Sequence, residues 1–352
     1  MTLKRKDFPI FWRIVCENSG GERRTAMLKT GFVFHQDYLK HLTGEGHPES
    51  PGRLKSLIDY LERKKLLQKL EMIRPQNPSV EWVKKIHSEE YIELMESCCR
   101  NRLVMLDADT VVCPDSYKVA LLAVGGVLSA VDEVAEKKVK NAFCAIRPPG
   151  HHAENKRAMG FCVFNNVAIG ARYVQEKHKF KKILIVDWDA HHGNGTQKIF
   201  YEDPSVFYFS IHEYPFYPGT GAERDKGEKE GEGFTFNIPM CVGSGDSEYI
   251  EVFENIFYPV AVKFAPDFIF ISAGFDGHQD DPLTNLNLTA DGFKRITEVV
   301  CDLADECCEG RLVSVLEGGY SLRALSESVS THLSVLMKYK LKGKKQVETG
   351  QG

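Results

Sequence analysis

Short apolar runs alternate with longer stretches in which apolar and polar residues recur at helical spacing. The apolar runs predict strands at residues 31–35, 142–146, 183–186, 206–211, 268–272 and 312–316. The longer stretches predict helices at residues 50–66, 116–136, 164–177, 249–264, 290–309 and 322–340. Runs that are apolar throughout, such as ILIV at 183–186, are typical of strands buried on both faces. The pattern predicts an α/β fold, a single domain with a central, mostly parallel β-sheet flanked by helices on both faces.

The two ends of the chain depart from this pattern. Residues 1–29 combine a basic start with a short apolar patch that Arg13 interrupts, and no small-residue cleavage site follows. We expect them to form a poorly ordered extension, with Met27 as an alternative start. Residues 30–340 are expected to form the folded domain and residues 341–352 a solvated tail. With no secretory segment evident, a cytoplasmic location is the default expectation.

Composition and charge exclude several classes of partner. The formal charge of −4 over 352 residues gives no overall basic surface for direct nucleic-acid binding. No apolar stretch approaches the roughly 20 residues that would span a membrane. The ten cysteines are expected to be reduced thiols, because no CxxC pairs with a second CxxC and no secretory context is evident. The oligomeric state stays open, with a homo-oligomer among the alternatives.

Each cluster of polar or titratable residues follows directly after a predicted strand. The clusters are RPPGHH at 147–152, DWDAHHGNGT at 187–196, His212, AGFD at 273–276 and EGGY at 317–320. The carboxyl ends of parallel strands share one edge of a sheet, and ligands bind at that edge. We therefore expect the five clusters to converge on one crevice.

Three residues of these clusters form a candidate metal site. Asp189 and His191 are two positions apart, so both can point to one side of an extended segment, and Asp276 follows another strand. Three protein ligands with an open fourth position are typical of catalytic metal sites. The alternative is that Asp187 and Asp189 only cap the following helix.

The tandem histidines His151 and His152 form a candidate acid–base pair. They follow a rigid RPPG turn that fixes their direction. Two histidines facing a metal are suited to moving the protons of an activated water. Asp187 and Asn194 are the available partners for their far ring nitrogens. A carboxylate raises the pKa of a histidine more than an amide does, so the two histidines are expected to differ in pKa.

Three aromatic residues complete the candidate site. Tyr320 lies on a glycine turn at the same edge, where its phenol could donate to a developing oxyanion. Phe161 and Tyr217 could form the walls of an apolar channel, although core packing is the ordinary role of a single aromatic residue.

Taken together, these blocks resemble the signature motifs of the histone deacetylase family, which has the arginase/deacetylase fold. The matching stretches are HPESPGRL, LDADT, RPPGHH, GFCVFNNVA, DWDAHHGNGT, SIHE with YPFYPGTG, SAGFDGHQDDPL and LEGGYS. They occur in the family's order between about residues 30 and 336, which makes residues 30–340 the expected deacetylase catalytic domain. Asn194, where class I members carry an aspartate, makes the chain similar to the class II branch.

The resemblance implies roles for individual residues. One zinc ion per chain would be held by Asp189, His191 and Asp276, with His151, His152, Tyr320, Asp187 and Asn194 as catalytic residues. Substrate contacts would come from Phe161, Tyr217, Gly160, Leu283 and the rim aspartate Asp107, with Asp109 as the alternative. Arg53 would lie near an acetate exit. A structural monovalent cation, K⁺, would bind near Asp187, Asp189, His191, Ser210 and Ile211.

Two departures from relatives refine the predicted reaction. Arginase-type relatives bind two manganese ions through further carboxylates, but Gly193 and His278 occupy those positions, so one metal is predicted. Polyamine-selective relatives place an acidic residue after the Asp-Pro step, whereas Leu283 stands here. We therefore expect a zinc-dependent deacetylase of acetyl-lysine or a related acylated amine. The alternatives are an acetylpolyamine or other small-molecule amidohydrolase, a non-catalytic acyl-lysine binding module and a binuclear ureohydrolase.

Overall fold

The computed structural model describes residues 28–100 and 105–339. One parallel sheet of eight strands runs through this part of the chain, in the order β2-β1-β3-β8-β7-β4-β5-β6. The strands are β1 (Thr30–Val33), β2 (Glu71–Ile73), β3 (Asn141–Cys144), β4 (Ile183–Asp187), β5 (Val206–Glu213), β6 (Thr235–Met240), β7 (Phe268–Ala273) and β8 (Leu312–Leu316). The predicted α/β class with a parallel sheet is confirmed.

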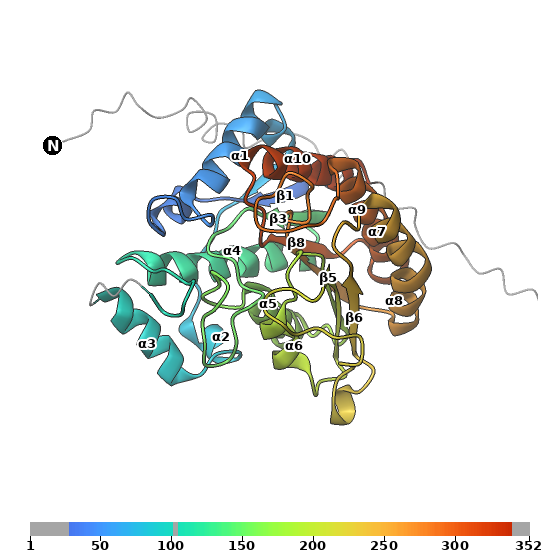
Figure 1. Cartoon of the computed structure of the whole chain (residues 1–352), viewed down its shortest axis with the longest axis horizontal. Helices are drawn as coiled ribbons and strands as arrows, with labels where there is room; N and C mark the ends of the chain where they lie inside the picture. The colour runs from blue at the N-terminus through green and yellow to red at the C-terminus, as the bar shows by residue number, and fades with distance from the viewer. Residues whose placement is uncertain (1–27, 101–104, 340–352) are drawn as a thin grey trace, which may run out of the picture.

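Helices cover the sheet as two layers (Figure 1). They are α1 (Pro51–Arg63), α2 (Val80–Lys84), α3 (Glu89–Arg100), α4 (Ser116–Ala135), α5 (Asn166–His178), α6 (Asn194–Phe200), α7 (Asp246–Val252), α8 (Tyr258–Phe264), α9 (Ala290–Cys308) and α10 (Leu322–Lys338). One layer contains α1, α10, α9, α7 and α8, and the other contains α4, α5 and the short helices near them. Because both faces are covered, β4, β7 and β8 are buried at every position, as their continuously apolar sequences predict.

Some elements differ from the prediction. The edge strands β2 and β6 were not predicted, because β2 is three residues long with two of them exposed, and β6 contains a proline. The short helices α2, α3 and α6 were not predicted either. The helix predicted at 249–264 begins earlier, at Asp246, and contains a π-helical turn at Phe253–Phe257. Pro259 lies in the first turn of α8 and cannot donate a helical hydrogen bond, which accounts for the interruption.

A buried ion network ties the segment before α1 to the sheet. Glu49 forms ion pairs with Arg147, which follows β3, and with Arg53 of α1, and all three side chains are fully buried. Arg147 also donates to the backbone oxygens of Tyr38 and His41 at 3.0 and 3.1 Å. Burial alone would raise the pKa of Glu49, but the two guanidinium groups lower it to about 2. The network therefore holds together the segment before α1, helix α1 and the segment that follows β3.

The predicted extension over residues 1–29 and the tail over 341–352 fall outside the described residues, apart from Leu28 and Lys29. Within residues 28–100 and 105–339, no helix is long and apolar enough to cross a membrane. The predicted boundary between extension, domain and tail therefore stays a prediction.

We predict that Glu49→Ala strongly destabilises the fold, because it leaves two buried guanidinium groups without their counter-charge. Removing one partner of a buried ion pair typically costs about 3–5 kcal/mol of unfolding free energy. Denaturant unfolding should show this loss, whereas Glu136→Ala, which removes an exposed ion pair with Lys138, should unfold like the unaltered chain. Equal stability of the two variants would contradict the role given to the network.

Candidate active site

The loops after β4 and β7 bring together the three residues predicted to bind a metal. Nδ1 of His191 lies 2.9 Å from Oδ2 of Asp276 and 3.2 Å from Oδ1 of Asp189. The two strands are neighbours in the sheet, and Asp187 pairs with Ser272, so the loops that follow them meet at one edge. Asp189 and Asp276 are buried, and the side chain of His191 is 12% exposed. The predicted convergence at this edge is present in the structure.

Backbone N–H groups orient the two carboxylates. Gly318 donates to Oδ2 of Asp189 at 2.8 Å, and Ala190 donates to Oδ1 of Asp276 at 2.9 Å, which leaves the other oxygen of each on the side of His191. A Cβ at Gly318 would collide with both carboxylates, so a glycine is required at this position. One ligand atom from each of the three residues lies within 4.8 Å of the others. Two fixed carboxylates and an imidazole fit a divalent transition metal ion.

The alternative that the aspartates only cap a helix is wrong. Helix α6 begins at Asn194 after the N-cap residue Gly193, and no side chain makes a cap hydrogen bond there. Oδ1 of Asp187 instead accepts from the N–H of Asp189 at 3.2 Å. Both carboxylates are therefore turned into the site and away from the helix.

Burial and close charges shift the pKa values of the candidate ligands. Burial opposes protonation of His191, but hydrogen bonds to Asp189 and Asp276 outweigh it and raise its pKa to about 10. Burial and the charge of Asp189 raise the pKa of Asp276 to about 7. Without a cation, protons therefore balance the charge of this cluster.

The tandem histidines lie beside the metal-ligand cluster, each with the partner that the sequence predicted. Nδ1 of His151 lies 3.1 Å from Oδ2 of Asp187, and Nδ1 of His152 lies 2.8 Å from Oδ1 of Asn194. The centres of the two rings are 4.0 Å apart. Nε2 of His151 is 3.8 Å from Asp189, so the pair borders the ligand cluster directly.

The two histidines differ in charge, as expected from their partners. Burial opposes protonation of His151, but the charges of Asp189 and Asp187 outweigh it and raise its pKa to about 10. Burial and the charges of His151 and His191 lower the pKa of His152 well below its ordinary value. His151 is thus held as a cation and His152 as a neutral imidazole, able to accept a proton.

Aromatic rings lie beside His152 and Tyr320. The ring of Phe161 meets that of Tyr320 edge-on at 5.7 Å, and Tyr217 meets His152 edge-on at 5.3 Å. Tyr217 is 39% exposed, which places it at the surface end of this group. The guanidinium of Arg53 lies 5.0 Å from the centre of the Tyr320 ring, although its expected place near an acetate exit stays a prediction.

The structure distinguishes the two candidate rim aspartates. Asp109 accepts from the N–H of Gly160 at 3.0 Å, next to Phe161, and contributes to the raised pKa of Tyr217. Asp107 instead forms an ion pair with Arg157, whose Nη2 is 2.9 Å away. Asp109 therefore lies against the predicted substrate-contact residues, and the role given to Asp107 stays a prediction.

The predicted monovalent-cation residues come from the end of β4, the loop that follows it and the second half of β5. Asp187 pairs with Ser210 in the sheet, and the buried Ile211 follows. The hydroxyl of Ser210 is 2.9 Å from Nδ1 of His212. These residues are close neighbours, while cation binding itself stays a prediction.

Two further residues singled out from the sequence, His278 and Leu283, lie outside the metal-ligand cluster, as does His192, the neighbour of the candidate ligand His191. His192 is bound on both ring nitrogens, to Thr220 at 2.7 Å and Gln197 at 2.9 Å, which is a structural role. His278 accepts from a backbone N–H two residues further on at 3.1 Å, and it is not part of the described ligand cluster. Leu283 is half-buried in the segment after β7.

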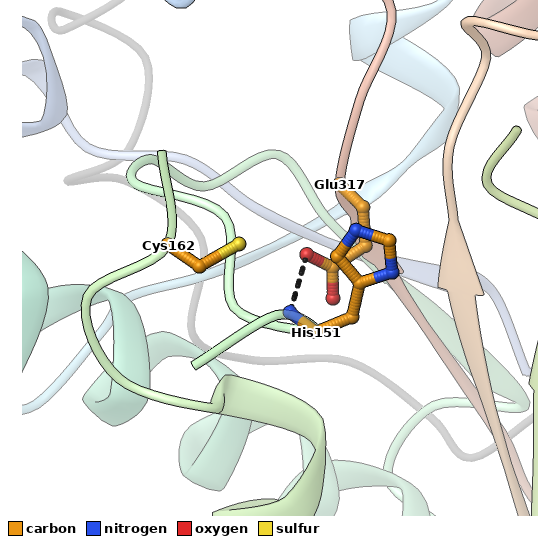
Figure 2. A group of neighbouring side chains, drawn as sticks. All are labelled: His151, Cys162 and Glu317. Atoms are coloured by element: carbon orange, nitrogen blue, oxygen red, sulfur yellow. Dashed lines mark hydrogen bonds between the residues drawn. The ribbon is translucent and has the colours of Figure 1, made fainter. Parts of the chain in front are cut away.

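Glu317 is a residue of the site to which the sequence assigned no role. Its buried carboxylate accepts from the N–H of His151 at 3.2 Å (Figure 2). It also accepts from the N–H of Gly150 at 2.7 Å and from the hydroxyl of Ser272 at 3.3 Å. Cys162 lies nearby, but the carboxylate already has protein donors and burial raises the pKa of the thiol, so this group is a poor metal site. Glu317 instead anchors the turn that carries the tandem histidines. Its place directly after a strand was the available signal.

Comparison with known proteins identifies the family and the fold of this chain. The histone deacetylase domain family matches residues 47–336. A probable deacetylase of Archaeoglobus fulgidus is 44% identical over 295 residues, covering 83% of this chain and 82% of that protein. The chloroplastic histone deacetylase 14 of Arabidopsis thaliana is 39% identical over 310 residues, covering 83% and 73%. The crystal structure of the HDA15 HD domain superposes with a TM-score of 0.84 at 37% identity, covering 88% of each chain.

The fold and the site thus define an α/β protein of the arginase/deacetylase class, with its candidate chemistry at the carboxyl edge of a parallel sheet. The chain belongs to the histone deacetylase family.

We predict that His191→Gln abolishes tight Zn²⁺ binding, because it removes the single imidazole ligand of the cluster. His192→Gln is the matched control, since the adjacent histidine bonds to Thr220 and Gln197 instead. Metal content after dialysis should fall well below one ion per chain for the first variant and stay at the unaltered level for the second. Full metal retention by His191→Gln would remove it from the ligand set.

We also predict that metal binding releases protons. Hydrogen bonds to Asp189 and Asp276 raise the pKa of His191 to about 10, so its proton must leave when a metal binds. The apparent affinity for Zn²⁺ should therefore fall by roughly tenfold for each unit that the pH is lowered from about 8 to 7. Calorimetry at one pH in buffers of different ionisation enthalpy measures the released protons directly. An unchanged heat across buffers would contradict the prediction.

Proposed function

We propose that this chain is a zinc-dependent hydrolase that removes the acetyl group from acetyl-lysine or a related acylated amine. The single observation that carries the proposal is the position of two histidines with different partners, one a carboxylate and one an amide. They lie beside a cluster of two carboxylates and one imidazole. Membership of a family whose relatives are named deacetylases supports the same chemistry. A zinc ion held by Asp189, His191 and Asp276 would supply Lewis-acid polarisation of the amide carbonyl and would acidify a water molecule.

The tandem histidines would move the protons of the reaction. His152 is neutral, so it accepts the proton of the attacking water, and it can then return that proton to the nitrogen of the leaving amine. His151 is held as a cation by Asp187 and Asp189, so its positive charge stabilises negative charge that develops nearby. The two residues therefore perform different tasks because their partners differ.

Tyr320 would stabilise the tetrahedral oxyanion. Burial raises the pKa of its phenol well above the ordinary value, so the hydroxyl keeps its proton and can donate it in a hydrogen bond. Its ring is fixed by Phe161 on one side and by the guanidinium of Arg53 on another. The hydroxyl of Tyr320 is therefore already in place when negative charge develops on the substrate oxygen.

The aromatic group favours a substrate with an extended apolar stem. Phe161 and Tyr217 meet Tyr320 and His152 edge-on, so a lysine side chain passing between them would carry its acyl group to the histidines. Leu283 provides no charge for a distant ammonium group, which favours acyl-lysine over acetylpolyamine. Retention of every expected catalytic residue argues against a non-catalytic binding module.

We predict that Tyr320→Phe lowers kcat for an acetyl-lysine peptide by at least ~10²-fold, the effect typical of losing one oxyanion donor. The substrate KM should change little, because the aromatic ring remains. Released acetate measures the rate, and zinc content must match that of the unaltered chain. Near-normal turnover would remove Tyr320 from the mechanism.

A substrate panel separates the proposed activity from its rivals. Acetyl-lysine peptides should be turned over faster than acetylated putrescine, and a chelator should abolish both reactions until Zn²⁺ is restored. Faster turnover of the polyamine would favour the small-molecule amidohydrolase. Peptide binding that survives chelation, with no acetate released before it, would favour a binding module.

A further inference from the structure

The amide of Asn194 is surrounded by acceptors on one side. Its Nδ2 lies 3.2 Å from Oε1 of Glu154, 3.3 Å from Sδ of Met159 and 3.5 Å from the backbone oxygen of His152. Its Oδ1 faces Nδ1 of His152 at 2.8 Å. The strongest of the three acceptors is the carboxylate of Glu154, because a thioether is a weak acceptor and the backbone contact is long.

An ionised carboxylate can only accept hydrogen bonds, so Glu154 fixes which end of the Asn194 amide faces it. The NH₂ group must point to Glu154, and the carbonyl oxygen must then point to His152. An oxygen at that place requires His152 to carry its proton on Nδ1. Nε2 of His152 is then left as the acceptor, on the side of the ring away from Asn194.

We propose that Glu154 is a positioning residue that sets the tautomer of His152 by orienting Asn194. The inference rests on the proposed function, in which His152 accepts a proton from water through Nε2. The opposite amide orientation would turn the carbonyl oxygen toward the Glu154 carboxylate, which cannot donate to it, and the NH₂ group toward His152, so Nδ1 would have to accept. The proton of His152 would then move to Nε2 and block it.

The surroundings of Glu154 separate this role from a purely structural one. Its side chain is 20% exposed and pairs with the exposed Lys198 at 2.7 Å, in a cleft of about 650 Å³ that also reaches Asn194. The backbone of Glu154 is held independently, because its N–H donates to the oxygen of Arg157 at 2.9 Å and its oxygen lies 2.8 Å from Nδ1 of His87. Replacing its side chain therefore leaves the local chain path supported.

Glu154→Gln is expected to lower kcat by about 10- to 100-fold, the range seen when a residue that orients a functional histidine is lost. A glutamine side chain can present either an oxygen or an NH₂ group, so it no longer imposes one orientation on Asn194. KM should be nearly unchanged, because Glu154 lies behind the histidine. Glu202→Gln, in the same cleft and paired with surface Lys229, is the matched control and should keep full activity.

A double-substitution cycle gives the decisive comparison. Asn194→Asp places an acceptor-only carboxylate beside His152, which fixes the same tautomer without needing orientation. In that background Glu154→Gln should cost nothing, and removing the like charge should even raise kcat. If Glu154→Gln costs the same factor with Asn194 and with aspartate at that position, the residue acts only structurally and the proposal is overturned.

The tautomer can also be read without turnover, which separates this inference from the proposed function. Long-range ¹H–¹⁵N spectra of the zinc-loaded chain, with histidine ¹⁵N labels and His152→Gln for assignment, distinguish protonated from unprotonated ring nitrogens. We expect the proton on Nδ1 in the unaltered chain and a mixture in Glu154→Gln. An unchanged Nδ1 tautomer in the variant would overturn the proposal, even if deacetylation is observed. A chain with no deacetylase activity would defeat the proposed function while this readout still tests Glu154.

Discussion

The compensation of buried negative charge is the constraint on which the site depends. Asp187, Asp189, Asp276 and Glu317 are all at most 1% exposed and lie at one edge of the sheet. Buried carboxylates are costly unless charges or hydrogen bonds offset them. Here the offset comes from backbone N–H groups and from two imidazoles whose pKa values are raised to about 10. A divalent cation would take over part of this offset, so the same buried negative charge favours the binding of a metal.

The parallel sheet makes this arrangement possible. Neighbouring strands β4, β7 and β8 end at the same level, so loops that are far apart in sequence supply groups to one small volume. The close approach of these loops to one another also requires glycines. A Cβ at Gly160, whose φ is +56°, would collide with the His152 ring, and one at Gly318 would displace two carboxylates. The glycines of the motifs are therefore part of the geometry of the site and do more than form turns.

The sequence was sufficient to predict the central strands and the polar residues that follow them. It was less informative about contacts that depend on the paths of the loops. The strands of the sheet centre were found because residues buried on both faces give continuous apolar runs, whereas the exposed edge strand β2 gives no such signal. The pairing of His151 with Asp187 followed from two clusters at carboxyl ends of strands in one parallel sheet. The position of Asp109 against Gly160 did not follow, because Asp107 and Asp109 differ only in how a loop turns. The link from Glu154 to Asn194 was invisible for the same reason.

The unequal partners of the tandem histidines show how neighbouring identical residues acquire different chemistry. Asp187 brings a charge to His151, so that histidine is held as a cation. Asn194 brings only a dipole to His152, which is then kept neutral by burial and by repulsion from His151 and His191. A dipole can be reversed, whereas a carboxylate presents oxygens in either orientation. A site that uses asparagine to keep its base neutral therefore needs a further group to define the direction of the amide, and Glu154 stands where that group is required.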